Sequence, residues 1–596
     1  MRKRLLMLAL ALGLAATSMP ALPVEAKTTG QYTNPLMNGA DPTIVRGEDG
    51  YFYSGFGTDN DIYIKRSETL LGLSTADSHL VYDNPDSNRY IWGPYIYHID
   101  GTWYIYYSSS TENDFGYGHP SCYVLANDSK DPFEGEWYFP CKNTNVDDFE
   151  GNESEKDGLM KTESYGLVCG LLRINGELYY TYTKYDYFAN EPGHTKFNEC
   201  PTIVKMENPY TLTGPECTVA RPTYKWELQG DNIDEGCAYV EHDGYGYFAH
   251  SSSSFMNDNY CVGLSVIDLS QDVMDEKNWK KSTTPIMSRS DENSSFGPGS
   301  PLFVKSPDGT EDWLIYHGGP IGGQTATDRR VRAQIINWTD DDQINLGIPS
   351  NPDTVLDAPS GEMKTDVYEA EDATCSSVTK QMFNNTAKAS GSGYVKYDKG
   401  NGYVEFDVDA AEAGDYILNL RYNNLGDAIT ADVKVNDDEH SVSFKRNGKY
   451  AVDLDTAKVY NVHLNEGENK VRVSVEGATQ FALDAMVITK GHMYEGTGNA
   501  NISVNVPYTG SYQVLFEGAA GNVIKNVNLT KGSNTLNNPD GKYDRVTVCE
   551  AITSTYEVSG NTANVHVESE GIYDITYTTA DGVFTLAKKL DQGENT

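Results

Sequence analysis

Short apolar runs alternate with turn-forming residues along this chain, and five of the runs share one feature. The runs YFYSGF, WYIYYSS, ELYYTYT, YGYFAHSS and DWLIYHG are aromatic and β-branched and too short for helices. Each lies just after one of five Asx-Gly pairs, Asp49-Gly50, Asp100-Gly101, Asn175-Gly176, Asp243-Gly244 and Asp308-Gly309. Such pairs favour the type I′ turns of β-hairpins. One hairpin per unit predicts a β-propeller of about five blades, and a sandwich with irregular loops is the alternative.

The second half of the chain has a different texture. Turn residues cluster around Pro349–Pro352 and Pro359–Gly361, which predicts a linker. From VYEAED to FALDAMVIT, apolar and polar residues alternate between closely spaced turns, as in an antiparallel β-sandwich. After Lys490 that texture repeats and predicts a further small β-sandwich. We therefore expect an all-β chain with domains at residues 31–358, 364–490 and 491–596.

The N-terminus resembles an export signal. Arg2, Lys3 and Arg4 precede an apolar run from Leu5 to about Ala16, and residues 24–26 read Val-Glu-Ala, a small-x-small cleavage pattern. These features predict a signal peptide over residues 1–26. The apolar run is shorter than the roughly 20 residues that a bilayer requires. We expect a secreted monomer without a membrane span.

Charge and cysteine content narrow the possible partners. The formal net charge is −40 and no basic cluster offsets it, so nucleic acid is not expected as a partner, whereas neutral polymers remain possible.

Seven of the nine cysteines lie between Cys122 and Cys261, without the spacing of a zinc site. An odd count leaves at least one thiol unpaired in a monomer, and the pairing of the others stays open. Most of the 42 tyrosines are expected to pack in sheets, although aromatic faces also stack on sugar rings.

Two carboxylates in separate loops are candidates for acid–base chemistry. Asp41 stands in NPLMNGADPTIV, where Pro42 restricts its backbone and apolar neighbours surround it, which suits a general base. Glu235 stands in GDNIDEGCAYVEHDG, and partial burial there would raise its pKa, as a general acid requires. The alternatives are a turn or capping role for Asp41 and a solvated loop position for Glu235.

Five motifs in order resemble glycoside hydrolase family 43. They are NGADPTIV, IWGPYIYHIDGTWYIYYS, NPYTLTGPECTVARPTYKWE, DEGCAYVEHDG and SFGPGSPLFVKSPDGTEDWLIYH, between about Asn34 and Gly347. The resemblance implies a five-bladed propeller that hydrolyses arabinofuranosides, β-xylosides and related plant polysaccharide linkages with inversion and without a catalytic cofactor. It also implies that Asp41 is the base and Glu235 the acid, with carboxyl groups roughly 6.5–9.5 Å apart.

The chain departs from the family pattern at several positions. Val168 stands where the family has a third carboxylate, which orients the base and tunes the acid. The family often has Glu, Pro and His at the positions of Tyr95, Cys237 and Ser300. Because the His at the position of Ser300 is absent, a metal in the central channel of the propeller is less expected. An acidic insertion offers Asp157 or Glu163 as replacements for the missing carboxylate. A weakened enzyme, or a propeller that only binds carbohydrate, is the alternative to an efficient hydrolase.

Three further residues are candidates for substrate contact. Phe56 and Trp92 are expected to wall a sugar subsite, and Arg332 in DRRVRAQ resembles the family's substrate-contacting arginine. Core packing or a surface ion pair is the alternative for each of them.

The segment from Val367 to Lys490 resembles carbohydrate-binding modules of family 6 and, less closely, of family 35. The resemblance implies a structural calcium held by Glu369, Glu371 and Asp484. The alternative is that these acids are exposed strand charges. The segment has no Trp, so a tyrosine is expected to stack on the sugar and an asparagine to hydrogen-bond it. The candidates are Tyr394, Tyr397, Tyr422, Tyr450, Asn423 and Asn424.

Overall fold

A computed structural model of the chain describes residues 30–595 with gaps. The gaps are 59–60, 85–89, 111–119, 142–143, 146–159, 188–196, 323–327, 340–342, 353, 383–389, 392, 399, 448–453, 479, 497, 520, 539–540, 553–554, 560–561, 568–570, 580–581 and 591–592. From Thr555 onward only the backbone is described. The predicted signal peptide over residues 1–26, Asp157 and Tyr450 lie outside the described residues.

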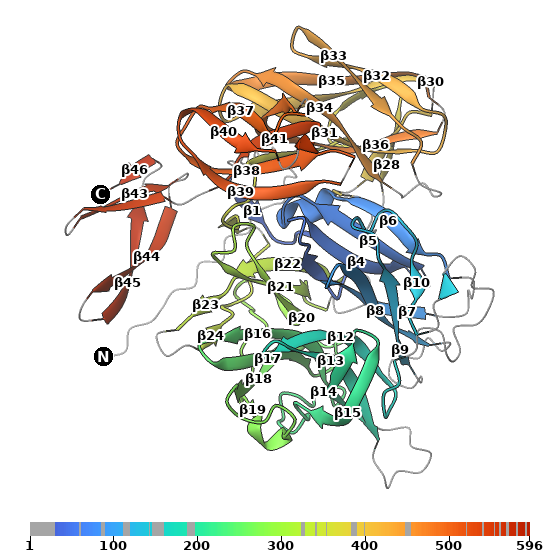
Figure 1. Cartoon of the computed structure of the whole chain (residues 1–596), viewed down its shortest axis with the longest axis vertical. Coiled ribbons are helices and arrows are strands. Elements are labelled where there is room, and N and C mark those ends of the chain that lie inside the picture. Colours follow the sequence, from blue (N-terminus) through green and yellow to red (C-terminus); the bar gives the residue numbers. More distant parts are fainter. Residues whose placement is uncertain are drawn as a thin grey trace, which may run out of the picture.

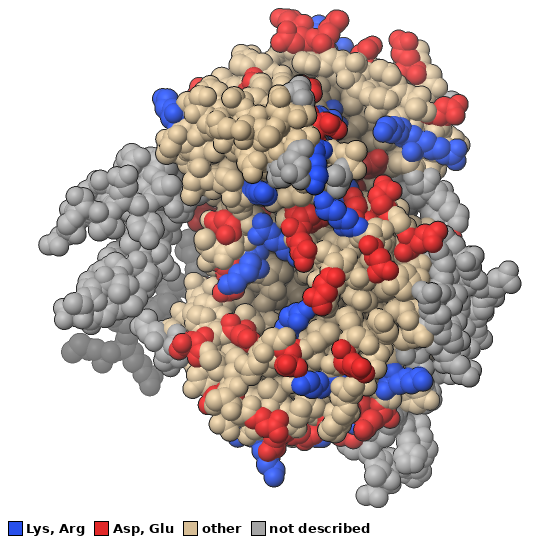
Figure 2. All heavy atoms as spheres, viewed as in Figure 1, with Lys and Arg blue, Asp and Glu red and all other residues tan. Residues whose placement is uncertain are grey.

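The described residues form β-strands and short 3-10 turns, so the predicted all-β class is confirmed. In that part of the chain no helix is long and apolar enough to cross a membrane. Figure 2 shows acidic and basic side chains interspersed over the visible face, with both signs gathered where the two halves of the molecule meet.

Five antiparallel sheets follow one another through the first half of the chain (Figure 1). The first contains β3 (Ile44–Arg46), β4 (Phe52–Thr58), β5 (Asp61–Ser67) and β6 (Asp77–Tyr82). The second contains β7 (Tyr90–Ile99), β8 (Thr102–Ser110), β9 (Ser121–Asn127), β10 (Tyr138–Phe139) and β11 (Thr144–Asn145). The third contains β12 (Gly166–Ile174), β13 (Glu177–Tyr187), β14 (Phe197–Asn208) and β15 (Thr211–Thr218). The fourth contains β16 (Asp234–His242), β17 (Tyr245–Ser252), β18 (Cys261–Asp268) and β19 (Lys280–Lys281).

The fifth sheet joins residues from both ends of this half. It contains β20 (Phe296–Lys305), β21 (Asp312–Gly319) and β22 (Arg330–Ile335), and its last strand is the N-terminal β2 (Met37–Asn38). A cavity of about 410 Å³ is lined by residues of β3, β7, β12, β16 and β20, the end strands of the five sheets. The five sheets are therefore arranged around a common centre.

Each Asx-Gly pair lies in the hairpin that the sequence predicted. Both residues have positive φ at Asp100-Gly101, Asn175-Gly176 and Asp243-Gly244, as a type I′ turn requires. At Asp49-Gly50 and Asp308-Gly309 only the glycine has positive φ. The turn type was therefore predicted correctly for three hairpins and incorrectly for two, where the glycine alone accommodates the left-handed position.

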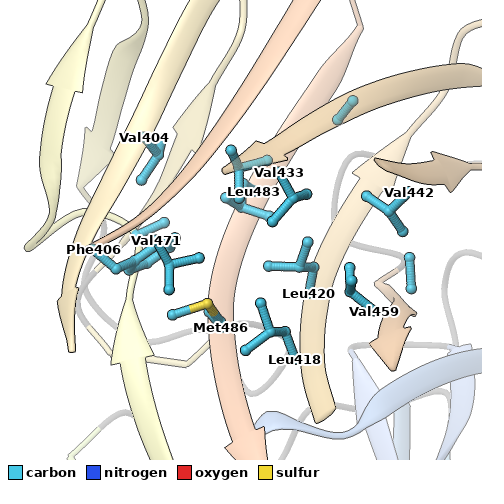
Figure 3. Close-up of a cluster of buried hydrophobic side chains, with 14 of the residues drawn as sticks. Val404, Phe406, Leu418, Leu420, Val433, Val442, Val459, Val471, Leu483 and Met486 are labelled. Carbon is cyan, nitrogen blue, oxygen red and sulfur yellow. The ribbon is translucent and has the colours of Figure 1, made fainter. Parts of the chain in front are cut away.

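The second half contains two larger sheets that face each other across a hydrophobic core (Figure 3). One contains β30 (Gly400–Ala410), β35 (Gly467–Ala478), β32 (Ile429–Val435), β33 (Asp438–Phe444) and β27 (Thr374–Ser376). The other contains β26 (Thr365–Glu369), β28 (Thr379–Met382), β29 (Gly393–Lys396), β31 (Gly414–Asn424), β34 (Asp455–Leu464) and β36 (Phe481–Glu495). Phe406 and Val471 of the first sheet meet Leu418 and Met486 of the second, and all four are buried. Each such side chain contributes about 1.5–3 kcal/mol by leaving water.

Strand β36 continues beyond this core into the C-terminal segment. Its last residues, from Gly491, pair with β41 (Arg545–Glu550), which also pairs with β38 (Gly510–Glu517) next to β39 (Val523–Leu529). The predicted boundary after Lys490 falls inside this strand. Outside it, β37 (Asn501–Val506) pairs with β40 (Gly532–Asn537), and β42 (Thr555–Ser559), β43 (Thr562–Val567), β44 (Gly571–Thr579), β45 (Gly582–Leu590) and β46 (Gly593–Asn595) complete the chain.

The first sheet packs directly against the second half of the chain. Leu515 and Ile524 belong to the same buried cluster as Tyr51 and Trp103. Beyond the turn-rich segment that the sequence marked as a linker, Glu362 is buried and its Oε1 accepts a hydrogen bond of 2.6 Å from the backbone N–H of Leu70. The predicted linker is therefore followed immediately by a residue that holds the two halves together.

Candidate active site

A backbone irregularity recurs at corresponding points of the sheets around the central cavity. β7, β12 and β16 each carry a β-bulge near their start, and the bulges contain Gly93, Val168 and Gly236 with φ of 52°, 48° and 120°. Ser300 in an irregular stretch of β20 has φ of 47°, and Asp41 before β3 has φ of 51°. Each of these five residues is followed by Pro or Cys. Val168 thus occupies in the third sheet the place that Asp41 occupies in the first.

Asp41 lies between two groups that favour its ionised form. Its Oδ1 accepts a hydrogen bond of 2.7 Å from Ser300 Oγ and lies 3.5 Å from Arg329 Nη1. Burial would raise the pKa of Asp41, but the charge of Arg329 and the hydrogen bond from Ser300 hold it well below its usual range. The side chain remains 42% exposed, so water reaches a carboxylate that stays charged.

His317 fixes the backbone of Asp41. The backbone N–H of Asp41 donates to His317 Nδ1 at 3.2 Å, and the imidazole is fully buried. Burial lowers the pKa of His317, so the ring is neutral at neutral pH and its Nδ1 is able to accept. This bond stabilises the left-handed conformation of Asp41, which a non-glycine residue seldom adopts.

Glu235, in contrast, is held toward its protonated form. Burial is the largest cause that raises its pKa, to about 7, and the charge of Asp41 adds to it. Tyr260 opposes this shift, because its hydroxyl donates to Glu235 Oε1 at 2.6 Å. A carboxyl group with this pKa is protonated in weakly acidic solution, where Asp41 is charged.

Tyr260 connects the two carboxyl groups. Its ring stacks on His317 at a centroid distance of 5.7 Å and an interplanar angle of 12°. Gly299 provides the space for this ring, since a Cβ there would lie 2.0 Å from Tyr260 Cε1. Glu235, Tyr260, His317 and Asp41 thus form a continuous row from the fourth sheet to the first. In weakly acidic solution the row contains one protonated and one charged carboxyl group.

The two acids expected to replace the missing carboxylate are Asp157 and Glu163, and the structure describes only Glu163. Glu163 is exposed and its backbone N–H donates to Glu216 Oε1, so nothing directs its side chain into the row of Asp41 and Glu235. Asp157 lies outside the described residues. A residue that the sequence reading did not consider, Glu199 on β14, is buried and interacts electrostatically with Glu235.

The arginine near Asp41 is Arg329, which lies three residues before the predicted Arg332. Arg332 is 2% exposed and its Nη1 donates to the carbonyl of Ser350 at 3.0 Å, away from Asp41. Arg329 of the same motif approaches Asp41 instead and lies over the ring of Phe255 at 4.8 Å. The prediction for Arg332 was wrong because strand β22 turns that side chain into the packed interior. DRRVRAQ offered three arginines, and only the fold distinguishes between them.

The aromatic candidates of the first half are both partly exposed. Trp92 directly precedes the bulge of β7 and stacks on Tyr90 at 6.4 Å and 14°. Phe56 stacks on Tyr63 at 5.4 Å, and Lys65 Nζ lies 5.6 Å from its ring. Tyr95 is buried, next to Cys237 above the central cavity.

Two of the four tyrosines proposed to stack on sugar lie inside the core of the second half. Tyr397 and Tyr422 are 1% and 2% exposed and belong to the buried cluster between the two sheets. Asn423 and Asn424 are buried as well. Tyr397, Tyr422 and Asn423 cannot present a surface to a polysaccharide, and these predictions were wrong because the strands turn these side chains inward. Tyr394 is partly exposed, with Lys396 Nζ 5.5 Å from its ring.

The three predicted calcium ligands gather around Ser390 and Gly391. Ser390 Oγ donates to Glu369 Oε2 at 2.7 Å and to Asp484 Oδ2 at 3.0 Å, and a Cβ on Gly391 would contact both Glu369 and Glu371. Burial, with the charges of Asp484 and Glu371, raises the pKa of Glu369 to about 8. Arg421 already pairs with Asp484 Oδ2 at 2.8 Å. Among the described residues, no group of three or more His, Cys, Asp or Glu side chains has the geometry of a metal site.

Seven of the nine cysteines are buried. The cysteines that follow the bulge residues in β12 and β16, Cys169 and Cys237, are among the buried ones. Cys237 lines the cavity, whereas Cys169 packs in a buried cluster with Tyr106 and Tyr180.

Comparisons with known proteins find relatives of the first half of the chain. The family described as glycosyl hydrolases family 43 matches residues 32–344. An extracellular exo-α-(1→5)-L-arabinofuranosidase of Streptomyces chartreusis is 31% identical over 323 residues, covering 53% of this chain and 90% of that protein. The protein of the same name in Streptomyces avermitilis is 30% identical over 352 residues, covering 57% of this chain and 68% of its own. The crystal structure of an α-L-arabinofuranosidase from Lactobacillus brevis is 27% identical, with a TM-score of 0.46 over 54% of this chain and 98% of that one.

Proposed function

Because the chain belongs to glycosyl hydrolase family 43, we propose that it is a secreted α-L-arabinofuranosidase that acts on arabinose-containing plant polysaccharide. Family membership confirms the glycosidase class that the ordered motifs predicted. Two relatives named as extracellular exo-α-(1→5)-L-arabinofuranosidases support the choice of sugar and the export. A β-xylosidase, which the sequence also allowed, is the alternative specificity.

The observation that carries this proposal is the opposite protonation of two carboxyl groups in one site. Glu235, with a pKa raised to about 7, gives its proton to the glycosidic oxygen as the bond to the sugar breaks. Asp41, held in its charged form by Arg329 and Ser300, takes a proton from the water that attacks the opposite face of the sugar. The anomeric configuration is therefore inverted, and neither step needs a metal or cofactor. The five sheets around the cavity act as the blades of a five-bladed propeller.

The test is hydrolysis of 4-nitrophenyl α-L-arabinofuranoside and of arabino-oligosaccharides. Glu235→Gln and Asp41→Asn are each expected to lower kcat/KM for the natural linkage by about 10²–10⁴-fold. Glu207→Gln, an exposed acid on β14, is the matched control and is expected to retain activity. Absence of turnover by the unaltered protein on arabinose and xylose substrates would refute the proposal.

A binding protein without efficient catalysis is the second candidate function. Val168, at the place that corresponds to Asp41, favours it because Val can neither carry charge nor accept a hydrogen bond. Titration calorimetry with arabino-oligosaccharides distinguishes the two. Tight binding without hydrolysis supports the second candidate, and rapid turnover excludes it.

For the second half we propose a carbohydrate-binding module at residues 364–490, followed by a C-terminal domain at residues 491–596. Tyr394 is the partly exposed aromatic that remains among the described candidates. The carboxylates Glu369, Glu371 and Asp484 would hold a calcium ion, although Asp484 would then share its charge with Arg421. A calcium-dependent rise in the melting temperature, lost in Glu371→Gln, tests the ion. Binding to insoluble arabinan, lost in Tyr394→Ala, tests the module.

A further inference from the structure

A parallel pair of aromatic rings lies on the loop between β15 and β16. The rings of Tyr224 and Trp226 are parallel to within 8°, and their centroids are 6.3 Å apart. Parallel rings at this separation overlap little, so neither ring covers the other. Both side chains are partly exposed. They belong to the motif NPYTLTGPECTVARPTYKWE, to which the proposed acid–base chemistry gives no role.

Partial exposure sets Trp226 apart from most tryptophans of the chain. Four of the seven are buried, namely Trp103, Trp137, Trp279 and Trp313. Trp92, which precedes the bulge of β7, resembles Trp226, because Tyr90 stands two residues before it and the two rings are parallel to within 14° at 6.4 Å. The chain therefore presents a partly exposed Tyr-x-Trp pair twice, once at the central cavity and once on the loop before β16.

The loop holds the two rings in place through polar contacts. Trp226 Nε1 donates to the carbonyl of Thr283 at 3.0 Å. The backbone N–H of Glu227 donates to the carbonyl of Tyr224 at 2.9 Å and closes the turn. The buried Glu227 accepts through Oε2 from the backbone N–H of Tyr224 at 2.6 Å, and it pairs with Lys281 at 2.7 Å. Rings fixed in this way lose little conformational freedom when a ligand binds to them.

The charged groups beside the rings compensate one another. Lys281 pairs with Glu227, and Arg221 Nη1 lies 2.8 Å from Glu276 Oε2. The chain as a whole carries a net charge of −40, which repels anionic polymers. Aromatic faces without an excess of positive charge suit the apolar C–H face of a neutral sugar.

The loop that carries the rings leads to the proposed acid. Glu235 follows Trp226 by nine residues. Between them the carbonyl of Gln229 accepts a hydrogen bond of 2.6 Å from Ser253 Oγ. Ser253 begins the segment that ends at Tyr260, whose hydroxyl donates to Glu235. The rings and the acid are therefore joined both along the chain and by hydrogen bonds across it.

Resting on the proposed function for the identity of the sugar, we propose that Tyr224 and Trp226 form a second carbohydrate-binding platform, which holds a neutral arabinose-containing chain beyond the sugar that is cleaved. A sugar unit outside the site of cleavage places the C–H face of its ring on the two aromatic rings. The platform takes no part in proton transfer. It tethers the polymer near Glu235 and Asp41, so its contribution grows with the length of the substrate.

Calorimetry with arabino-oligosaccharides of increasing length tests the platform in the full chain carrying Glu235→Gln, which slows turnover of the ligand. In that background Tyr224→Ala should weaken the binding of the longer oligosaccharides by about 3- to 10-fold and that of arabinobiose much less. Tyr224→Phe keeps the ring and should keep the affinity. Tyr245→Ala removes an exposed tyrosine at the far end of the fourth sheet and is the matched control. Unchanged affinity in Tyr224→Ala, or an equal loss in Tyr224→Phe, would overturn the platform.

Tryptophan fluorescence gives a second reading that needs no change at Tyr224. Long oligosaccharides should alter the emission of the Glu235→Gln protein more than arabinobiose does, because a sugar then lies on Trp226. Trp226→Phe should remove this excess while the melting temperature shows that the fold is kept. An excess of the same size in Trp226→Phe would place the extra sugars elsewhere and refute the platform.

The kinetics of the active protein distinguish the platform from the proposed function. The ratio of kcat/KM for linear arabinan to kcat/KM for 4-nitrophenyl α-L-arabinofuranoside should fall in Tyr224→Ala, through a higher KM for arabinan, and stay constant in Tyr245→Ala. If the oligosaccharides bind as described to a protein that hydrolyses no arabinoside, the platform stands and the proposed function fails. If hydrolysis is rapid and the ratio is unchanged in Tyr224→Ala, the proposed function stands and the platform fails.

Discussion

At the scale of single residues, two carboxyl groups of similar chemistry are driven in opposite directions by their neighbours. Asp41 and Glu235 could be singled out from the sequence because their motifs, ADPT and DEGC, resemble the family pattern. Their partners were not, since Ser300, His317 and Arg329 lie 259 to 288 residues from Asp41 along the chain. Only the closure of the five sheets brings these side chains together. Arg332 illustrates the limit, because a motif alone does not say which of three arginines faces the site.

Removing the hydroxyl of Tyr260 should shift the pH range of activity. This hydroxyl donates to Glu235 Oε1 and so favours the ionised carboxylate, which lowers the pKa of Glu235. In Tyr260→Phe that pKa rises, and the alkaline limb of kcat/KM should move to higher pH by about one unit. Tyr245→Phe, at an exposed hairpin position, is the control and should leave the limb unchanged. A limb that stayed in place in Tyr260→Phe would mean that this hydrogen bond does not govern the acid.

At the scale of secondary-structure elements, the hairpins were far more predictable than the bulges. The Asx-Gly pairs located all five hairpins, because the turn chemistry is written in two adjacent residues. The bulges depend on how β7, β12 and β16 approach the centre, and no local signal marks Val168 as left-handed. A β-branched residue in that conformation is strained, because its Cβ crowds the backbone.

Relief of this strain should stabilise the first half of the chain. Asn tolerates the left-handed region better than Val, and Val168 is only partly buried, so Val168→Asn should raise the free energy of unfolding by about 1 kcal/mol. Tryptophan fluorescence during denaturation in urea measures this half selectively, because all seven Trp lie between Trp92 and Trp338. Val367→Asn on the exposed face of β26 is the control. Equal changes in the two variants would contradict the assignment of strain to Val168.

At the scale of the whole molecule, the two halves are joined by buried polar contacts as well as by apolar packing. Thr456 Oγ1 donates to Asp77 Oδ1 at 2.5 Å, and Lys458 pairs with Glu68. The sequence predicted a linker near Pro359 from its cluster of Pro, Ser and Gly. The composition of a linker does not say whether the segments that it joins pack against each other. The orientation of the halves depends on long-range contacts that no window of sequence contains. For the same reason, the sequence could not show that Tyr397 and Tyr422, candidates for sugar stacking, lie in the core.

The contact between the halves should weaken as the pH rises. Burial and the charge of Asp455 raise the pKa of Asp77 to about 7, above that of an unfolded aspartate. The unfolded chain therefore releases this proton at lower pH than the folded one, and stability falls between about pH 4 and pH 7. Asp77→Asn removes the cost of charging this group and should raise stability above pH 7, by an amount on the order of 1 kcal/mol.

Thermal melts at about pH 5 and pH 8 measure this effect. At pH 8 Asp77→Asn should melt at a higher temperature than the unaltered protein. At pH 5, where Asp77 is protonated, the two melting temperatures should lie closer together. Asp437→Asn, an exposed substitution in the turn between β32 and β33, is the control. A difference between unaltered protein and Asp77→Asn that is constant across pH would show that Asp77 is charged in the folded state.

The pairing of β2 with β22 has a consequence for the biogenesis of the enzyme. Asp41 follows β2 by three residues, so the strand that completes the fifth sheet also carries the proposed base. Ser300, His317 and Arg329 lie 259 to 288 residues further along the chain and are synthesised after it. Asp41 therefore lacks these neighbours until β22 has been made and has paired with β2. We expect fragments that end before β22 to lack the surroundings of Asp41 and to hydrolyse no glycoside.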